Sequence, residues 1–261
     1  MPLVPPSAPL AREARLLVDD LQAAYADSLR QAAAPAGLGV DFEPVDWLRD
    51  GGAHGGGRRL SAGDSVAFDR ASLNVSSVHY DDLPDKRLSS ATALSCIVHP
   101  RHPRAPSMHL HTSWTELRSG RGYWRVMADL NPSHPVPVHS ERLRAALSRA
   151  AGSHWEDGRR QGDRYFYIPA LGRHRGVVHF YLEGHNSGDW GEDAALAGSV
   201  VMAAIGAYCG ILEEVWTAAE APTEASAAAT SFRRRSSDRR RSRVLSPSRD
   251  GGGGLRAVSA I

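Results

Sequence analysis

Residues 94–117 read LSCIVHPRHPRAPSMHLHTSWTEL, and the secondary structure of the protein is clearest here. On both sides of its Pro-rich centre, every second side chain is one that a protein core accepts. These side chains are Leu94, Cys96 and Val98 before the centre, and Met108, Leu110, Thr112 and Trp114 after it. A period of two is typical of a strand with one buried face. The stretch therefore predicts two strands of a sheet.

The same alternation marks further strands along the chain. It occurs at Val66 and Phe68, at Leu73 and Val75, at Trp124, Val126 and Ala128, and at Val178, Phe180 and Leu182. A short aromatic strand is predicted over residues 164–168. Consecutive strands joined by short connections are usually antiparallel. We therefore expect one large antiparallel sheet of about seven strands.

Helical spacing of apolar residues predicts helices over residues 11–33, 139–151 and 192–221. Together with the strands, they indicate an α+β protein whose sheet is flanked by helices. The glycine-rich run GGAHGGG at residues 51–57 is expected to form a flexible loop that ends in Arg58 and Arg59. This run matches neither a dinucleotide-binding fingerprint nor a P-loop, so we reject a nucleotide site.

Composition divides the 261 residues into three parts. Residues 1–10 are Pro-rich and residues 222–261 are rich in Arg, Ser and Gly, so both are expected to be disordered. Residues 11–221 form the expected single domain. The net charge of +2 hides a division, because residues 231–261 hold nine Arg and two Asp, whereas residues 1–230 hold 22 basic and 27 acidic side chains. We expect the body not to bind nucleic acid.

The chain is expected to be cytoplasmic. Its N-terminus lacks the apolar stretch of a signal peptide, and its longest apolar run, residues 200–212, is too short to cross a bilayer. Its two cysteines, Cys96 and Cys209, are far apart in sequence and are expected to stay reduced. No membrane span is therefore predicted.

Histidines dominate the candidate chemistry. His99, His102, His109 and His111 fall within thirteen residues, and on a strand His109 and His111 point to the same face. Such a set could bind a metal or share a proton-transfer site, but solvated or structural histidines show the same pattern. Asp129, where a strand meets a Pro-containing turn, could equally serve to stabilise that turn.

Five segments, taken in order, resemble the oxygen-dependent coproporphyrinogen III oxidases. They are DFEPVDWLRDGGAHGGGRRLSAGDSVAFDRASLNVSSVH (residues 41–79), ATALSCIVHPRHPRAPSMHLHTSW (residues 91–114), GYWRVMADLNPSHP (residues 122–135), RYFYIPALGRHRGVVHFYLEG (residues 164–184) and AIGAYCGILEEVW (residues 204–216). The second is the most specific match. The resemblance implies a seven-stranded antiparallel sheet flanked by helices, usually in a homodimer.

The resemblance also implies a reaction of haem biosynthesis. Two propionates of coproporphyrinogen III are oxidatively decarboxylated to vinyl groups, which gives protoporphyrinogen IX with O2 as the acceptor and without an organic cofactor. A tetracarboxylate macrocycle requires cationic and backbone donors, and removal of a proton requires a positioned acid or base.

Position by position, the resemblance assigns roles to named residues. His109 falls at the acid/base histidine, and Asp129 falls at the acidic residue thought to contact the pyrrole nitrogens. Ser95, His111, Arg175 and Arg58 are the substrate-binding candidates, the last because a guanidinium can hold a carboxylate. His99, His109 and His139 are the candidate ligands of a divalent metal. We expect this metal set to stay incomplete, because Ala170 stands where the family signature has a further histidine.

Other departures leave alternatives open. Where the family has Asn-x-Arg, this chain has His111 and Ser113, and Leu171 and Arg173 replace further signature residues. The family's closing C-terminal strand has no counterpart in the sequence. One alternative is therefore a degenerate relative that binds a tetrapyrrole or carboxylate without turnover. A histidine metalloprotein unrelated to haem is the other, and the ordered motifs disfavour it.

Overall fold

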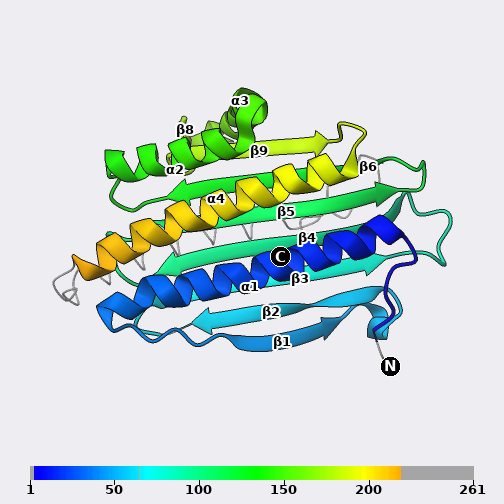
Figure 1. Ribbon diagram of the computed structural model, residues 1–261, viewed down its shortest axis with the longest axis horizontal. Helices are drawn as coiled ribbons and strands as arrows, with labels where there is room; N and C mark the ends of the chain where they lie inside the picture. The colour runs from blue at the N-terminus through cyan, green and yellow to red at the C-terminus, as the bar shows by residue number, and fades with distance from the viewer. Residues whose placement is uncertain (1–2, 64, 219–261) are drawn as a thin grey trace. The chain divides into compact units, whose positions relative to one another are not determined.

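An antiparallel sheet forms the centre of the fold. The computed structural model describes residues 3–63 and 65–218. Seven strands pair in the order β1-β2-β3-β4-β5-β6-β9, each antiparallel to its neighbours (Figure 1). They are β1 Glu43–Leu48, β2 Gly55–Gly63, β3 Phe68–His79, β4 Leu88–Pro100, β5 Ser107–Leu117, β6 Gly122–Asn131 and β9 Val178–His185. The predicted α+β class is confirmed.

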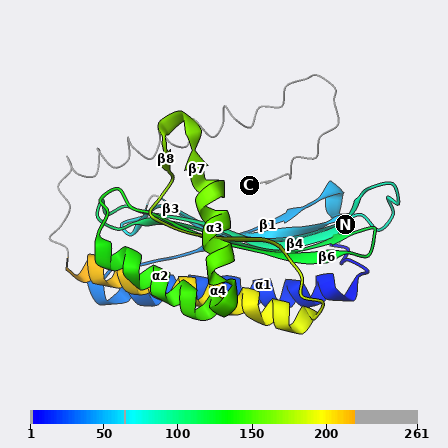
Figure 2. The same ribbon diagram turned by 90° about the horizontal axis from the view of Figure 1, so that it is seen from above.

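Three long helices cover one face of this sheet. α1 (Pro9–Ala33) and α4 (Trp190–Thr217) lie side by side and run roughly along the strands, and α2 (Pro137–Ala151) packs against α4 (Figure 1, Figure 2). These helices match the three that the apolar spacing predicts, with ends shifted by a few residues. Their apolar faces need a partner, and the buried face of the sheet supplies it.

The core lies between the sheet and these helices. From the strands it takes the side chains of every second residue, and from the helices those at helical spacing. Its largest fully buried members are Trp124, Tyr25, Tyr208, Phe68, Phe180, Leu29, Leu73, Leu94, Met108, Leu110, Leu130 and Leu143. The hydroxyl of Tyr208 donates to the carbonyl oxygen of Pro106 at 2.9 Å, which ties α4 to the turn between β4 and β5.

A fourth helix, α3 (Trp155–Phe166), passes the β9 edge of the sheet and leads to a small hairpin, β7 (Tyr167–Ile168) and β8 (Arg173–His174). Figure 2 shows this hairpin on the side of the sheet opposite to α1, α2 and α4. We call this side of the sheet the open face. Four short 3-10 helices complete the described elements: Ala34–Ala36, Asp50–Gly52, Gly152–His154 and Pro169–Leu171.

Several local predictions are wrong. Part of the expected glycine loop, from Gly55 onward, is paired strand, because β3 supplies backbone partners along all of β2. Gly57 is needed there, since a Cβ would meet the Trp47 ring at 2.8 Å. The two strands predicted around Phe68 and Val75 are one strand, β3, and most of the strand predicted at residues 164–168 is the end of α3.

The N-terminal residues that composition marks as disordered contact the body of the fold where the structure describes them. The Val4 amide donates to the Gly52 carbonyl at 3.0 Å, and His79 Nε2 is 3.0 Å from the Val4 carbonyl oxygen. The Ser7 amide donates to Asp81 at 2.8 Å. Residues 3–8 therefore lie as a strap along the end of the sheet. The predicted tail, residues 222–261, lies outside the described residues.

Helix α4 is long and apolar enough to cross a membrane by length and composition alone. Half of its most apolar window is buried inside the fold. Buried residues such as Val201, Ile205 and Leu212 are part of the core cluster. The packing of α4 on the sheet therefore accounts for its apolar sequence, as in the core helix of any layered fold.

Candidate active site

Asp129 is the centre of the candidate site. It lies near the end of β6 on the open face and is fully buried. The Nε of Arg175 donates to its Oδ2 at 2.6 Å, and a guanidinium nitrogen contacts the same oxygen. The amide of Asn131 donates to Oδ2 at 2.8 Å, and His179 Nδ1 is 3.1 Å from Oδ1. A buried carboxylate is tolerated because it is paired and hydrogen-bonded in this way.

Arg175 reaches Asp129 because the hairpin after α3 returns to the sheet. Its backbone N–H donates to the carbonyl of Phe166 at 2.9 Å, and its guanidinium lies 4.6 Å from the centre of the Phe166 ring. Gly176 follows with a φ of +72°, and a Cβ there would overlap the Leu130 carbonyl. The Arg175-Gly176 pair in the matching segment 164–184 thus has a physical reason.

His179 is held by aromatic neighbours. Its ring stacks on Phe166, with centroids 5.1 Å apart, and on His174, with centroids 5.4 Å apart. Sequence reasoning missed His179 as a site residue, although its position on β9 opposite Asp129 makes it one. The sequence offers little indication of this role, because neither strand's sequence shows which residue of β9 pairs with Asp129.

His109 is the residue directly opposite Asp129 in the β5–β6 ladder. Both side chains point to the open face, while Met108 and Trp124 are buried on the helix side, as strand alternation predicts. The His109 ring is 5.4 Å from that of His99, whose Nδ1 is 3.0 Å from the Ser107 hydroxyl. Burial, with contributions from Arg175 and His99, lowers the pKa of His109 well below its usual value. The imidazole is therefore neutral at pH 7 and can accept a proton.

Two further predicted residues form a polar row on the same face. The Ser95 hydroxyl lies 2.7 Å from His111 Nδ1, and the Ser113 hydroxyl lies 3.1 Å from His111 Nε2. Loss of hydration lowers the pKa of His111 to about 4, with a smaller contribution from Arg125. His111 is therefore a neutral group that can both donate and accept a hydrogen bond. The structure brings Ser95, His111, His109 and Asp129 to one face.

Arg58 does not join them. It lies opposite Val75 in the β2–β3 ladder, so its side chain is on the helix side of the sheet. There its Nε donates to Asp46 at 2.7 Å, in the outermost strand. Arg58 therefore does not share the face of His109, and its role in substrate binding stays a prediction.

His139 is also apart from the other histidines. It lies in the first turn of α2, where its Nε2 is 3.3 Å from Glu214 of α4. His99 and His109 are on the open face, with the sheet between them and this helix layer. Ala170 lies in the 3-10 helix after β7 and offers no ligand. The residues present therefore do not fit a three-histidine metal site, and among the described residues there is no cluster of three His, Cys, Asp or Glu that could hold a metal ion.

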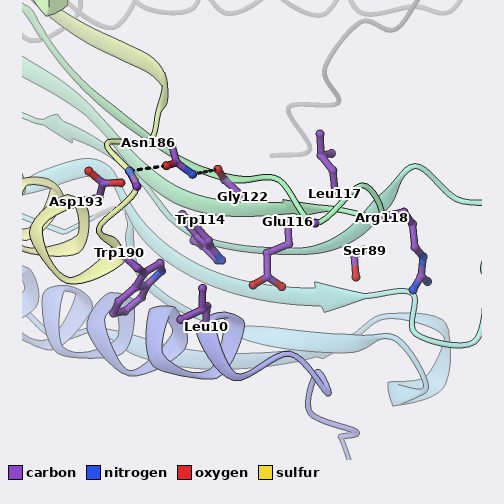
Figure 3. A pocket seen from close by; sticks show the side chains of 12 residues that line it. Leu10, Ser89, Trp114, Glu116, Leu117, Arg118, Gly122, Asn186, Trp190 and Asp193 are labelled. Carbon is purple, nitrogen blue, oxygen red and sulfur yellow. Dashed lines mark hydrogen bonds between the residues drawn. The ribbon is translucent and has the colours of Figure 1, made fainter.

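A separate cavity of about 380 Å³ lies on the helix side, at the start of α4. Figure 3 shows Trp114 and Glu116 of β5 and Trp190 of α4 around it. The cavity is lined by none of the predicted site residues. The candidate active site is therefore the open face around Asp129 and not this cavity.

A broad antiparallel sheet that is covered by helices on one face and carries a buried Asp–Arg–His cluster and a histidine row on the other defines a class of α+β protein. The model of the family described as coproporphyrinogen III oxidase matches residues 14–235. This chain belongs to that family.

Curated relatives agree with this assignment. The chain is 27% identical over 195 residues to an oxygen-dependent coproporphyrinogen-III oxidase of Rickettsia akari, and the match covers 68% of each protein. It is 26% identical to the protein of the same name from Rickettsia africae over equal shares. The Rickettsia bellii protein is 26% identical over 181 residues, which are 64% of this chain and 63% of that relative.

Proposed function

We propose that this chain catalyses the oxygen-dependent decarboxylation of coproporphyrinogen III to protoporphyrinogen IX. The observation that carries the proposal is the position of His109 directly opposite Asp129 on one face of the sheet, in a chain of this family. For each vinyl group, one propionate carboxylate loses CO2, one proton and two electrons, and O2 takes up the two electrons and two protons, one of them from solvent, to give H2O2. O2 is the co-substrate, and the proposal requires no organic cofactor.

His109 fits the role of proton acceptor in this reaction. Its ring is neutral at pH 7 because burial disfavours the imidazolium. An acid/base histidine commonly contributes a rate factor of about 10²–10⁴. Ser95 and His111, held to each other at 2.7 Å, supply neutral hydrogen-bonding groups for the substrate on the same face.

Asp129 has a more constrained role than the family resemblance implies. Its carboxylate is fully buried and already accepts from Arg175 and Asn131. Pyrrole N–H groups can reach it after Arg175 moves aside, together with the hairpin that carries it. In the structure as described, Asp129 instead fixes Arg175 and His179 beside His109.

Because the Asp129 carboxylate is already occupied by Arg175 and Asn131, a second candidate function is favoured: binding of a tetrapyrrole without turnover. One experiment separates the two. The purified chain is incubated in air with coproporphyrinogen III, and the porphyrins are measured by chromatography after oxidation, together with the released CO2. Oxygen-dependent protoporphyrin and two CO2 per macrocycle support the enzyme. Bound but unchanged coproporphyrinogen supports the binding module.

The proposal includes the two expectations that accompany this family resemblance, a homodimer and a cytoplasmic location. Light scattering on the purified protein tests the first, because a mass near twice 28.1 kDa is expected. Cell fractionation tests the second. If the protein is a monomer that turns over substrate, the proposed reaction stands and the expected homodimer is wrong.

A further inference from the structure

Arg125 is a cation on the open face to which the sequence motifs give no role. It lies on β6 four residues before Asp129, so both side chains point to the same face, about 13 Å apart along the strand. In the β5–β6 ladder it is directly opposite Ser113, beside His111. Its side chain is 17% exposed, and neighbouring strands therefore hold most of it in place.

The partner of Arg125 is much more exposed than Arg125 itself. Its Nη2 donates to Glu183 at 2.6 Å, and the Glu183 side chain is 46% exposed. The other carboxylate oxygen of Glu183 accepts from the Tyr181 hydroxyl at 2.9 Å. Because the Glu183 carboxylate is half-exposed, it can turn into water when another carboxylate binds Arg125. A ligand carboxylate can take its place.

The other arginines considered for this role are committed elsewhere. Arg175 is bound to the buried Asp129, and Arg58 is on the helix side with Asp46. The neighbours of Arg125 on the open face, Ser113 and Tyr181, offer hydroxyl groups rather than competing cations. A guanidinium in such surroundings is suited to receiving a carboxylate through paired N–H donors.

We propose that Arg125 anchors one peripheral carboxylate of a carboxylated tetrapyrrole, in exchange for Glu183, while the reacting part of the ligand lies at His109. This inference rests on the proposed function and adds a residue and a subsite to it. The distance along the strands gives the subsite its selectivity, since a ligand must span from His109, which lies opposite Asp129, to Arg125 to use both. Short carboxylates are therefore poor ligands.

Binding of coproporphyrin III, followed by its fluorescence, tests the anchor. We expect R125Q to weaken binding about ten- to hundredfold, since a charge-assisted hydrogen bond is lost. E183Q is expected to tighten binding, because the competing counterion is gone. R121Q, in the exposed turn between β5 and β6, is the matched control and should bind as the parent chain does. The tetramethyl ester of coproporphyrin, which has no carboxylates, should not distinguish R125Q from the parent.

Thermal melting first establishes that R125Q is folded, and R125K provides a second variant that keeps the charge but loses the planar fork. Unchanged affinity in both, or weaker binding in E183Q, overturns the anchor. Failure of the anchor and failure of the reaction are distinguishable. If coproporphyrinogen III is turned over by R125Q with an unchanged KM, the reaction stands and the anchor is wrong. If the parent chain releases no CO2 but binds coproporphyrin through Arg125, the anchor stands without the reaction.

Discussion

Asp129 and Arg175 are 46 residues apart in the sequence, yet Nε of Arg175 is 2.6 Å from the fully buried Oδ2 of Asp129. The pair joins β6 to the segment that follows α3 and β7. It therefore fixes the hairpin against the open face and sets the position of the Phe166 ring, which contacts both Arg175 and His179. The chemistry of the site and the attachment of the hairpin depend on the same two side chains.

The two partners of this pair should differ in the cost of their removal. Asp129 is fully buried, whereas the Arg175 side chain is 23% exposed. R175Q leaves a buried carboxylate without its cation and should lower the free energy of unfolding by about 3–5 kcal/mol. D129N leaves a cation that can turn toward water and should cost less. Urea unfolding of both variants and of the double variant measures this, and a double variant as costly as the sum of the singles would contradict the coupling.

Strand alternation made the centre of the sheet predictable. Leu94, Cys96, Met108 and Leu110 alternate cleanly because one face of their strands is buried, and this parity also places His109 and Asp129 on one face. The edge strand β1 was missed because its residues are mostly exposed, so no alternation selects them. The start of β2 was missed because three glycines carry no side-chain pattern.

Predicting the rest of the site requires the register between neighbouring strands, and the sequence of a single strand does not show it. Arg125 shares the parity of Asp129, so the alternation could have found it. His179 could not be found in this way, because only the pairing of β6 with β9 brings it to Asp129. The face of Arg58 could not be predicted for the same reason, since it depends on the pairing of Arg58 with Val75. Helix α3 was not predicted, because it has few apolar residues and its glycines are unfavourable in a helix.

A second prediction concerns the glycines of α3. Gly158 and Gly162 face β9, and a Cβ at Gly162 would lie 2.9 Å from the Cβ of His179 and 3.0 Å from its backbone carbonyl carbon. G162A should therefore push α3 away from the strand and cost about 1–3 kcal/mol of unfolding free energy. The control is G206A in α4, where nothing lies within 4 Å, and there alanine should stabilise by up to about 1 kcal/mol. Equal melting temperatures for the two variants would contradict the close packing of α3.

A third prediction concerns turnover. If His109 accepts the proton, H109N should lower kcat at least about a hundredfold with little change in KM. The acid limb of the pH profile of the parent chain should lie below the usual histidine value of about 6.5, because burial lowers the pKa of His109. H134N, at an exposed position in the loop after β6, is the control. An H109N variant within threefold of the parent kcat would remove His109 from the proton transfer.

The last prediction is the acid sensitivity of the open face. The folded-state pKa of His111 is about 4, below the unfolded value of about 6.5, so the unfolded chain binds the proton more tightly. His111 therefore favours folding above pH 6.5, and this contribution is lost as the pH falls from about 6.5 to about 4. At about 1.4 kcal/mol for each pKa unit, the loss amounts to at most about 3.5 kcal/mol.

Replacing His111 isolates this contribution. H111N keeps a side chain that can hydrogen-bond to Ser95 and Ser113 but does not titrate in this range. Urea unfolding at pH 7 and at pH 4.5 should show a smaller drop in stability for H111N than for the parent chain, whereas H134N should drop as the parent does. Because other histidines titrate in both proteins, the difference between the two drops is the quantity of interest. A drop in H111N as large as that of the parent would mean that the His111 ring is hydrated in the folded protein and does not line a dehydrated substrate face.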